Sequence, residues 1–579
     1  MKASKKRGFT IIELVIVIAV IAILAAVLIP TFANIIQKAN VANDVALARN
    51  MNTILIADEA TNGRSTDMYD VLIALEQGGF KLENLNPRAD GNVFAWDKAN
   101  NQIVYLDKKN PDKPIFQAKE IGANKGDLYI TTRKAEVFAD YPGYSYYFAS
   151  DISGNITLDE GSCLDTGEFA LNGNVSVVTK KDVEIHGTIN GTITVDSASG
   201  KITNYSVVNN VVIVNTAATS YHERGHVAAM EIQNTLTGKV VLENDAYVET
   251  LTNNRTSGTV ESKGYVKAVD NASSDKTSVT ATQTGYVLEI GTYDQLVNFR
   301  NKVNAGASYS GMTVKLTADI DISERAWTPI GAAYRDKIDA NAKVFQGTFD
   351  GQGHKITGLT NTGFKISSVY SGRNDTTPHE YKEYVFGLFG SVYNATIKNI
   401  VMANVNVDLA CDEKEKVVGD SVGAIVGYAA GDEKTGVTID SCKVLSGSIV
   451  GYDAVAGIVG RSYSVKITIS NCENAATVTA IRRASGILGF ISKDTIDVKE
   501  VSITNCKNSG NVKQTGTPTT DPADKTQKGY GYYMVAGLAI CKKGTPTLKI
   551  DIAGSLNTGT VTLTVEKNEN KSDLFLHIQ

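Results

Sequence analysis

The chain has no excess of positive charge and few prolines or cysteines. Its 57 Lys and Arg are outnumbered by 62 Asp and Glu, and the net charge of −5 predicts no basic surface for nucleic acid. Only 10 of 579 residues are proline, whereas 51 are glycine and 25 are tyrosine, a composition typical of extracellular β-structure. Six cysteines permit disulfides in such a chain without demanding them. The length predicts three or four domains.

Charged side chains are also nearly absent from the N-terminal segment, where Glu13 is the only one between Phe9 and Ile29. As a helix these 21 residues would be about 31 Å long, enough to cross a hydrocarbon core of about 30 Å. Lys2, Lys5, Lys6 and Arg7 precede them, so the N-terminus should stay cytoplasmic while the rest faces outward. A secretory signal peptide would have a shorter apolar run, with its cleavage site after that run.

Glu13 needs a partner, because an unpaired carboxylate near the end of a membrane helix costs about 2 to 3 kcal/mol. Cleavage after Gly8 would supply one, the free ammonium of Phe9 on a neighbouring helix. The segment resembles the class III leader of type IV prepilins and pseudopilins. That family cleaves after a Gly, N-methylates the next residue, places Glu fifth and often carries a Pro twenty-second. Gly8, Phe9, Glu13 and Pro30 match these four features. The alternative is an ordinary single-pass anchor with a chance glutamate.

The resemblance implies processing between Gly8 and Phe9 by a prepilin peptidase, and N-methylation of Phe9. It also implies assembly through Glu13 and Pro30. The expected partners are the membrane before assembly, and other pilin subunits in a homo- or hetero-polymer afterwards. The protein is accordingly expected in the cell membrane first and later extracellular, on a pilus at the cell surface.

Helical periodicity continues beyond the apolar run. After the leader (residues 1–8), residues 9–60 predict one helix of about 50 residues, kinked at Pro30, half in the membrane and half serving as a spine. Thr61-Asn62-Gly63 should end it.

Residues 61–150 are assigned to a pilin-like headpiece and a linker. A second helix is predicted over Thr66–Gln77, capped by Ser65 or Thr66. Residues 92–97 and 102–107 are typical of a β-hairpin. Residues 108–150 are ambiguous and are expected to finish the headpiece and lead into the linker.

The remaining chain is predicted to be all β, giving an α+β protein overall. Residues 151–285 contain short strands separated by Gly, Asn and Asp, without a helical pattern, which favours a parallel β-solenoid. Residues 286–579 begin with a predicted capping helix, Tyr293–Val303. A repeat of 29 to 36 residues follows, anchored by Gly387-Leu-Phe-Gly390, Gly423-Ala-Ile-Val-Gly427, Gly457-Ile-Val-Gly460, Gly486-Ile-Leu-Gly489 and a weaker Ala536-Gly-Leu-Ala539.

Such periods indicate units that bury their apolar faces only by stacking. This half of the chain resembles the GLUG-repeat β-solenoids of bacterial surface proteins. Cys442, Cys472 and Cys506 occupy the same place in successive repeats, so we expect them to stack about 4.8 Å apart as an interior ladder of free thiols. A disulfide between neighbouring rungs is the alternative, although stacked strands seldom give the required geometry.

Two motifs suggest metal binding, each with a structural alternative. His222-Glu-Arg-Gly-His226 has the His-Glu-x-x-His form of zinc proteases, for which Glu243 is a conceivable third ligand. Gly225 instead favours a turn into a strand over residues 227–232. Asp319-Ile-Asp-Ile and Asp350-Gly-Gln-Gly could hold calcium, but Asp and Gly are also the ordinary residues of solenoid turns. We therefore expect no metal and no cofactor, with His222 and His226 as the weak candidates.

Tyrosines at 144, 146, 147, 530, 532 and 533 could form a sugar- or protein-binding surface, or could cover loop cores. No pair of carboxylates suited to glycosidic chemistry is evident, so the protein is not expected to be an enzyme. The sequence thus predicts a type IV pilin-like structural subunit, minor or at the tip, that displays a solenoid for adhesion to a host glycan or matrix ligand. The alternative is a secretion-system pseudopilin or a surface-anchored enzyme acting on polysaccharide.

Overall fold

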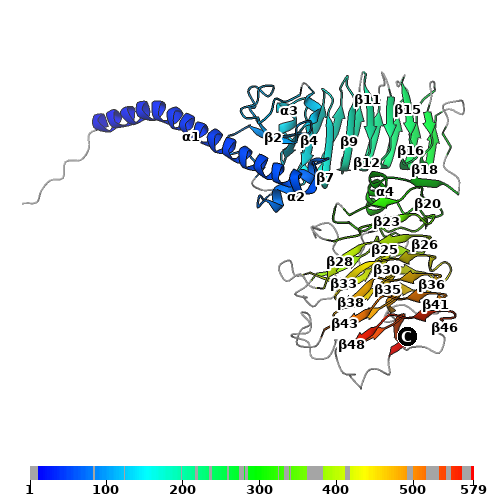
Figure 1. The fold of residues 1–579 in the computed structure, drawn as a ribbon. Coiled ribbons are helices and arrows are strands. Elements are labelled where there is room, and N and C mark those ends of the chain that lie inside the picture. Colours follow the sequence, from blue (N-terminus) through cyan, green and yellow to red (C-terminus); the bar gives the residue numbers. More distant parts are fainter. Residues whose placement is uncertain are drawn as a thin grey trace, which may run out of the picture.

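The computed structural model describes most of the chain, and Figure 1 shows its arrangement. The described residues are 11–81, 85–122, 124–196, 199–215, 220–233, 238–256, 260–272, 279–280, 285–323, 325–331, 338, 341–361, 382–410, 417–491, 500–516, 534–542, 549–563 and 575–578. A long N-terminal helix leads to a small headpiece, and two stacks of parallel strands follow. The expected fold class is confirmed.

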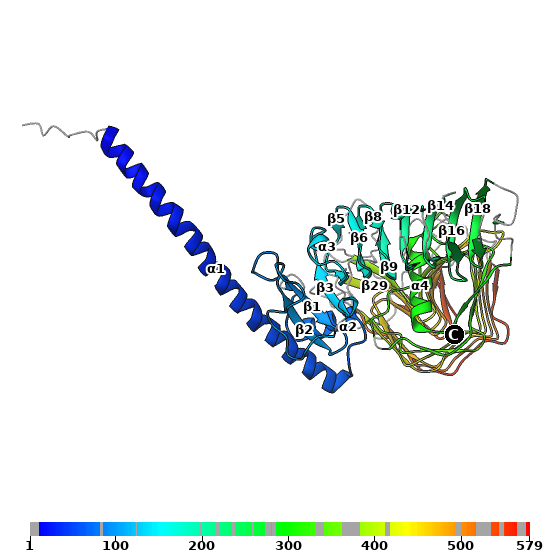
Figure 2. The same ribbon diagram turned by 90° about the horizontal axis from the view of Figure 1, so that it is seen from above.

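Helix α1 (Ile11–Asn62) has 52 residues and contains Glu13 in its first turn and Pro30 in its interior. Residues 11–40 extend away from the rest of the molecule, and packing against the headpiece begins near Val41 (Figure 2). The predicted single long helix is confirmed. It is gently curved and unbroken in Figure 1, so Pro30 does not interrupt it.

The headpiece begins with α2 (Met68–Gln77), which packs on α1 through an apolar face. Asp67 caps this helix by accepting a hydrogen bond from the Asp70 amide, so the prediction of Ser65 or Thr66 as the cap is wrong. Asp67 is the cap because it directly precedes Met68, the first helical residue, so its side chain reaches the free N–H group of Asp70. Strands β1 (Val93–Asp97) and β2 (Gln102–Leu106) form the predicted antiparallel hairpin.

Residues 108–150 hold a structured junction where the sequence suggested a linker. They contain η2 (Lys125–Asp127), β3 (Leu128–Thr132), α3 (Val137–Asp140) and β4 (Ser145–Phe148). Strand β3 pairs antiparallel with β1 and parallel with β4, and β4 pairs with the first long strand of the next stack. One continuous sheet therefore joins the headpiece to the first solenoid.

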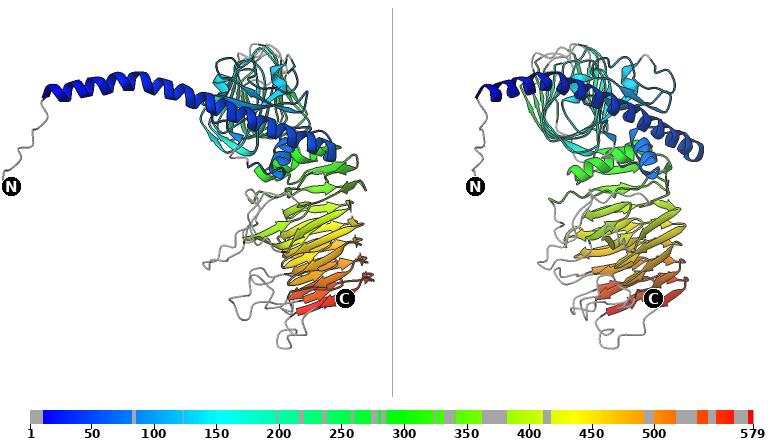
Figure 3. Two further views of the ribbon diagram at one scale, coloured as in Figure 1. Left: turned by 60° about the vertical axis from the view of Figure 1, so that its left-hand side comes forward. Right: turned by 90° about the vertical axis from the view of Figure 1, so that its left-hand side faces the viewer.

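The first solenoid winds parallel strands into coils of 19 residues where Asn204 pairs with Glu223 and Glu223 with Leu242. Its interior is filled by Val, Ile and Leu. The strands are β5 (Ile152–Ser153), β6 (Ile156–Leu158), β7 (Cys163–Asn172), β8 (Val175–Val177), β9 (Val183–Ile189), β10 (Ile193–Val195), β11 (Lys201–Asn204), β12 (Val207–Val214), β13 (Ser220–Glu223), β14 (His226–Ile232), β15 (Lys239–Leu242), β16 (Tyr247–Asn253), β17 (Val260–Ser262) and β18 (Tyr265–Asn271). Figure 3 views this stack nearly along its axis.

Helix α4 (Tyr293–Ala305) follows the first strand of the second solenoid and lies at its start, which confirms the predicted capping helix. Three of its sheets enclose the core together with the double layer described next. The first sheet comprises β19 (Val287–Ile290), β20 (Thr313–Leu316), β22 (Thr348–Asp350), β26 (Thr396–Lys398), β31 (Val437–Asp440), β36 (Lys466–Ser470), β41 (Glu500–Thr504) and β46 (Lys549–Asp551). The second comprises β21 (Ile320–Asp321), β23 (Lys355–Thr357), β27 (Val401–Ala403), β32 (Lys443–Val444), β37 (Glu473–Asn474), β42 (Lys507–Asn508) and β47 (Leu556–Asn557). The third comprises β28 (Val405–Leu409), β33 (Gly447–Gly451), β38 (Thr477–Ala480), β43 (Val512–Gln514) and β48 (Val561–Leu563).

Two further sheets lie back to back at one side of this solenoid. They comprise β24 (Lys382–Phe386), β29 (Val417–Gly423), β34 (Ala454–Ala456), β39 (Arg483–Ser485) and β44 (Met534–Ala536); and β25 (Phe389–Tyr393), β30 (Val426–Gly431), β35 (Val459–Ser464), β40 (Leu488–Ile491), β45 (Ala539–Lys542) and the antiparallel β49 (Phe575–Ile578). Each anchor motif spans the turn between them, and its second glycine or alanine lies in the strand that follows the turn. A Cβ at Gly460 would lie 2.5 Å from the Val422 amide nitrogen, so the anchors are glycine because the two sheets touch through their backbones.

Charged residues are buried inside this double layer. Arg461 Nη2 lies 3.1 Å from Asp420 Oδ1 and 2.8 Å from Asp453 Oδ2, and Arg483 also pairs with Asp453. In the row formed by β30, β35 and β40, Arg461 lies between Tyr428 and Phe490. The network satisfies its charges internally, so it specifies how the two sheets meet.

The two solenoids run in different directions and meet at a corner (Figures 1 and 3). Aromatic side chains fill that corner: Tyr247 of the first solenoid contacts Tyr309, which contacts Phe299 of α4. Tyr286 donates to the Asn244 carbonyl, and the buried Lys302 ammonium donates to the Asp245 carbonyl. The corner is therefore a packed joint.

Candidate functional site

The exposed half of α1 is the first candidate. From Ile11 to Ile29 its large apolar side chains are exposed, several of them by more than half. Within the described residues one helix, α1, is long and apolar enough to cross a membrane. Glu13 and Pro30 lie on it, whereas Gly8 and Phe9 lie outside the described residues. Such a surface requires either a lipid environment or neighbouring helices.

The second half of α1 is fastened to the headpiece by two buried polar side chains. Asp44 accepts hydrogen bonds from the Arg88 and Ala89 amides and from the Tyr105 hydroxyl, each 2.9 Å long. The Asn52 side chain bonds both backbone groups of Ile103 at 2.8 Å: its Nδ2 donates to the carbonyl, and its Oδ1 accepts from the amide. It thereby pairs with β2 as the backbone of a neighbouring strand would. Sequence periodicity identified the apolar face of this helix but gave no signal for these contacts.

The His-Glu-x-x-His motif lies on two strands. His222 is in β13, and its Nδ1 is 2.7 Å from Glu243 Oε1, the residue named as a conceivable third ligand. His226 begins β14 and faces Glu249 on the next coil at 3.6 Å. The predicted turn into a strand is confirmed. The two histidines lie on strands and not on one helical face, as zinc catalysis by this motif would require, and each is paired with its own carboxylate. No metal-binding group of three ligands occurs among the described residues.

The two aspartate motifs are used in turns. Asp350 accepts from the Gln352 amide and the Asn399 side chain and lies 3.2 Å from the Lys398 ammonium, contacts that lower its pKa against the opposing effect of burial. Asp319 accepts from the Lys355 amide. Protein donors therefore occupy the carboxylates that calcium would need.

The tyrosines at 144, 146 and 147 are buried in the headpiece, which supports the loop-core interpretation. The Tyr144 hydroxyl donates to the Pro111 carbonyl, and burial raises the pKa of Tyr144 to about 12. Tyrosines 530, 532 and 533 lie outside the described residues.

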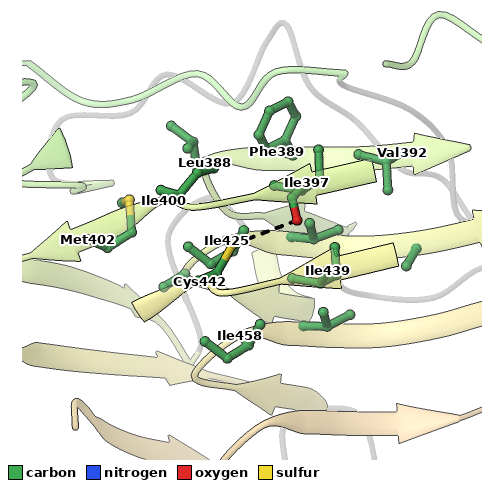
Figure 4. Close-up of a cluster of buried hydrophobic side chains, with 14 of the residues drawn as sticks. Leu388, Phe389, Val392, Ile397, Ile400, Met402, Ile425, Ile439, Cys442 and Ile458 are labelled. Carbon is green, nitrogen blue, oxygen red and sulfur yellow. Dashed lines mark hydrogen bonds between the residues drawn. The ribbon is translucent and has the colours of Figure 1, made fainter. Parts of the chain in front are cut away.

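The predicted thiol ladder is present in the second solenoid. Cys442, Cys472 and Cys506 are free and buried, and each follows a residue with positive φ: Ser441, Asn471 and Asn505. Figure 4 shows Cys442 among Ile397, Ile400 and Ile439, where its thiol donates to the Ile397 carbonyl at 3.8 Å. Hydrogen bonding to Cys442, together with burial, raises the pKa of Cys472 well above its ordinary value. The pKa values of Cys472 and Cys506 are both raised, so these two thiols are packing groups with little thiolate character. Cys411 lies outside the described residues.

A cluster on the outer face of the first solenoid escaped the sequence reasoning. Cys163, Glu184 and His186 lie on adjacent coils, and the His186 ring stacks on Tyr205 with centroids 4.5 Å apart. Burial lowers the pKa of His186, but hydrogen bonds to Cys163 and Glu184 outweigh it and raise the value to about 10. Burial raises the pKa of the Cys163 thiol. Because its pKa is raised, the Cys163 thiol has little thiolate character and is a poor nucleophile.

Comparison with known proteins bears on α1. A family model described as the prokaryotic N-terminal methylation motif matches residues 3–29. The N-terminal segment carries this methylation motif. The match spans Glu13 and the residues on either side of the expected cleavage point, so the methylation-motif helix is the same element that stands exposed in the fold.

Two curated relatives are similar to the N-terminal part of the chain. One is the type IV major fimbrial protein FimA of Dichelobacter nodosus (strain VCS1703A), 35% identical over 94 residues, 16% of this chain and 57% of the relative. The other is a fimbrial protein of Moraxella nonliquefaciens, 44% identical over 98 residues, 16% of this chain and 63% of the relative. The chain thus spans less than two thirds of the relatives it matches. No solved structure matches.

Proposed function

We propose that the protein is a type IV pilin-like subunit that enters a pilus through α1. The observation that carries the proposal is the position of the methylation motif on an apolar helix whose residues 11–40 lie apart from the rest of the fold. Glu13 lies in the first turn of this half of α1, where the N-terminal ammonium of a neighbouring subunit would meet it, and the headpiece contacts at Asp44 and Asn52 lie in the other half.

The finer proposal is a minor or tip subunit that displays the solenoids outside the cell for adhesion. The two solenoids are far larger than the covering that α1 needs, and such a cargo would crowd every position of a fibre. The side chains of His222, His226 and His186 are each paired with a neighbouring carboxylate or thiol, which favours display of a binding surface over catalysis. The ligand class is a host glycan or matrix component, and no cofactor is required.

Assembly can be tested in the producing cell with Glu13→Ala and Gly8→Val. We expect Gly8→Val to block leader removal and Glu13→Ala to reduce incorporation, read by N-terminal mass spectrometry for methylated Phe9 and by immunogold imaging of fibres. Lys38→Ala, an exposed charge change on the same helix, is the matched control. Normal incorporation of both variants would refute the proposal.

Display can be tested with the full chain in detergent on a panel of glycans and matrix proteins. Binding without chemical change of the ligand supports an adhesive role. Release of new reducing ends would replace it with an enzyme acting on polysaccharide, and the absence of any binding would leave the solenoids as a spacer.

A further inference from the structure

Arg325 connects two parts of the fold that are remote in sequence. It lies in the segment 325–331 of the second solenoid, and its Nη2 is 2.6 Å from Asp67 Oδ2 and 2.9 Å from Asp70 Oδ1. Both aspartates belong to the start of α2 in the headpiece. The side chain of Arg325 is only 19% exposed, so solvent screens these pairs less than a surface pair.

Aromatic rings complete the binding site of this guanidinium. Its centre lies 5.1 Å from the Tyr69 ring of α2 and 5.9 Å from the Tyr293 ring of α4. Burial opposes the charge, but Asp67 and Asp70 outweigh burial and raise the pKa of Arg325 further above its ordinary value. A planar group that stacks on rings and reaches two carboxylates is a role that lysine cannot fill.

The contact brings together two residues that are far apart along the chain. Asp67 and Arg325 are 258 residues apart, and β1–β21 lie between them. The chain leaves the headpiece, passes through the first solenoid, turns the corner at α4 and meets α2 again at Arg325. Helix α2 in turn packs on Ala48, Met51 and Leu55 of α1. Arg325 therefore links the second solenoid to the long helix through α2.

We propose that Arg325 is a latch that prevents the second solenoid from hinging about the corner relative to α1. Domains joined through modest interfaces move relative to one another by default, so a brace away from the joint is what limits such motion. The aromatic and carbonyl contacts at Tyr247, Tyr286 and Lys302 hold the corner itself. Arg325 adds a second point of attachment on the headpiece. The latch is a property of the fold and holds whether or not α1 assembles into a fibre.

The test measures the distance distribution between two labels on the full chain in detergent micelles. Noncanonical residues carrying the labels replace the exposed Asn50 of α1 and Lys507 of β42. We expect a single narrow peak for the parent protein and its loss in Arg325→Ala, with a broad distribution in its place. Arg325→Lys keeps the charge without the planar fork, and we expect an intermediate width.

The matched control is Lys443→Ala, which breaks the Lys443–Glu473 pair at 2.8 Å inside the second solenoid without crossing the corner. Its distribution should equal that of the parent. The strand signal in circular dichroism and the melting temperature of each variant show whether the solenoids are intact. A folded Arg325→Ala protein that keeps the narrow peak would overturn the proposal, as would equal broadening in Lys443→Ala.

Discussion

A ladder of buried asparagines runs through the second solenoid and makes a sharp prediction possible. Asn474 Nδ2 donates to Asn508 Oδ1 at 2.8 Å, and Asn508 Nδ2 donates to Asn557 Oδ1 at 2.8 Å. Asn508 also donates to the Gly510 carbonyl at 2.9 Å, and its side chain has no solvent exposure. The substitution Asn508→Asp keeps the shape of the side chain but removes both donors.

The free energy of unfolding that is lost in Asn508→Asp can be estimated from these contacts. Two donated hydrogen bonds contribute about 1 kcal/mol each, and the acceptors of Gly510 and Asn557, left against a carboxylate, add about 2 kcal/mol of desolvation. The sum is about 4 kcal/mol, which corresponds to about a thousandfold increase in the population of the opened coil at neutral pH. Because a solenoid is held mainly by neighbouring coils, the effect should stay within β37, β42 and β47.

Amide hydrogen exchange with mass spectrometry measures this directly, with each variant compared to the parent at the same pH. The new carboxyl group is buried against acceptors, so its folded pKa must lie above the unfolded value of about 3.9. The folded state then binds more protons, and protection should be lost as pH rises through that folded pKa and recovered on acidification. Asn511→Asp is the control, because Asn511 is exposed and its Oδ1 only accepts, from the Thr560 amide. Protection of β42 within tenfold of the parent at pH 7 would refute the reasoning.

Three further outcomes are expected. Burial raises the pKa of Glu223 from 4.5 to about 7. The free energy of unfolding should therefore fall by about 3 kcal/mol as the pH rises between these two values. Glu223→Gln should reduce this pH dependence in denaturant titrations at pH 5 and 8. The ladder thiols at 442, 472 and 506 should resist iodoacetamide until the protein unfolds, and a loss of about 2 Da per bridge in the nonreduced mass would contradict free thiols. Gly460→Ala should cost about 2 to 3 kcal/mol in thermal unfolding, whereas Gly122→Ala, with open space around it, should be neutral.

The features that sequence predicted well are local or periodic. The α1 helix, the β1–β2 hairpin and the α4 cap depend on contacts within a few residues, and the glycine anchors repeat at a readable interval. Even the thiol ladder could be predicted, because Cys442, Cys472 and Cys506 follow the same strand in successive repeats.

The features that sequence missed depend on which residues face each other across coils. Glu243 is a conceivable third metal ligand by sequence because it lies downstream of His222, yet the pairing of β13 with β15 places it beside His222 as a hydrogen-bond partner. The cluster of Cys163 with His186 and the buried charges around Arg461 likewise need the register before they can be recognised. The spacing of residues along the chain can be read from one sequence, but coil lengths that vary from 18 to 51 residues hide which residues face each other between coils.

The missing linker has a mechanical consequence. Had residues 108–150 been a flexible linker, a load on the solenoids would first extend that linker. Instead β3, β4 and β7 pair directly, so force applied to the first solenoid passes to the headpiece through sheet hydrogen bonds. The headpiece passes it to α1 at Asp44 and Asn52, two contacts made in the half of the helix that stays outside the apolar segment. An element that must hold a large cargo on a membrane-anchored or polymerised helix requires such an uninterrupted path, and a chain that only needed to cover its helix would not.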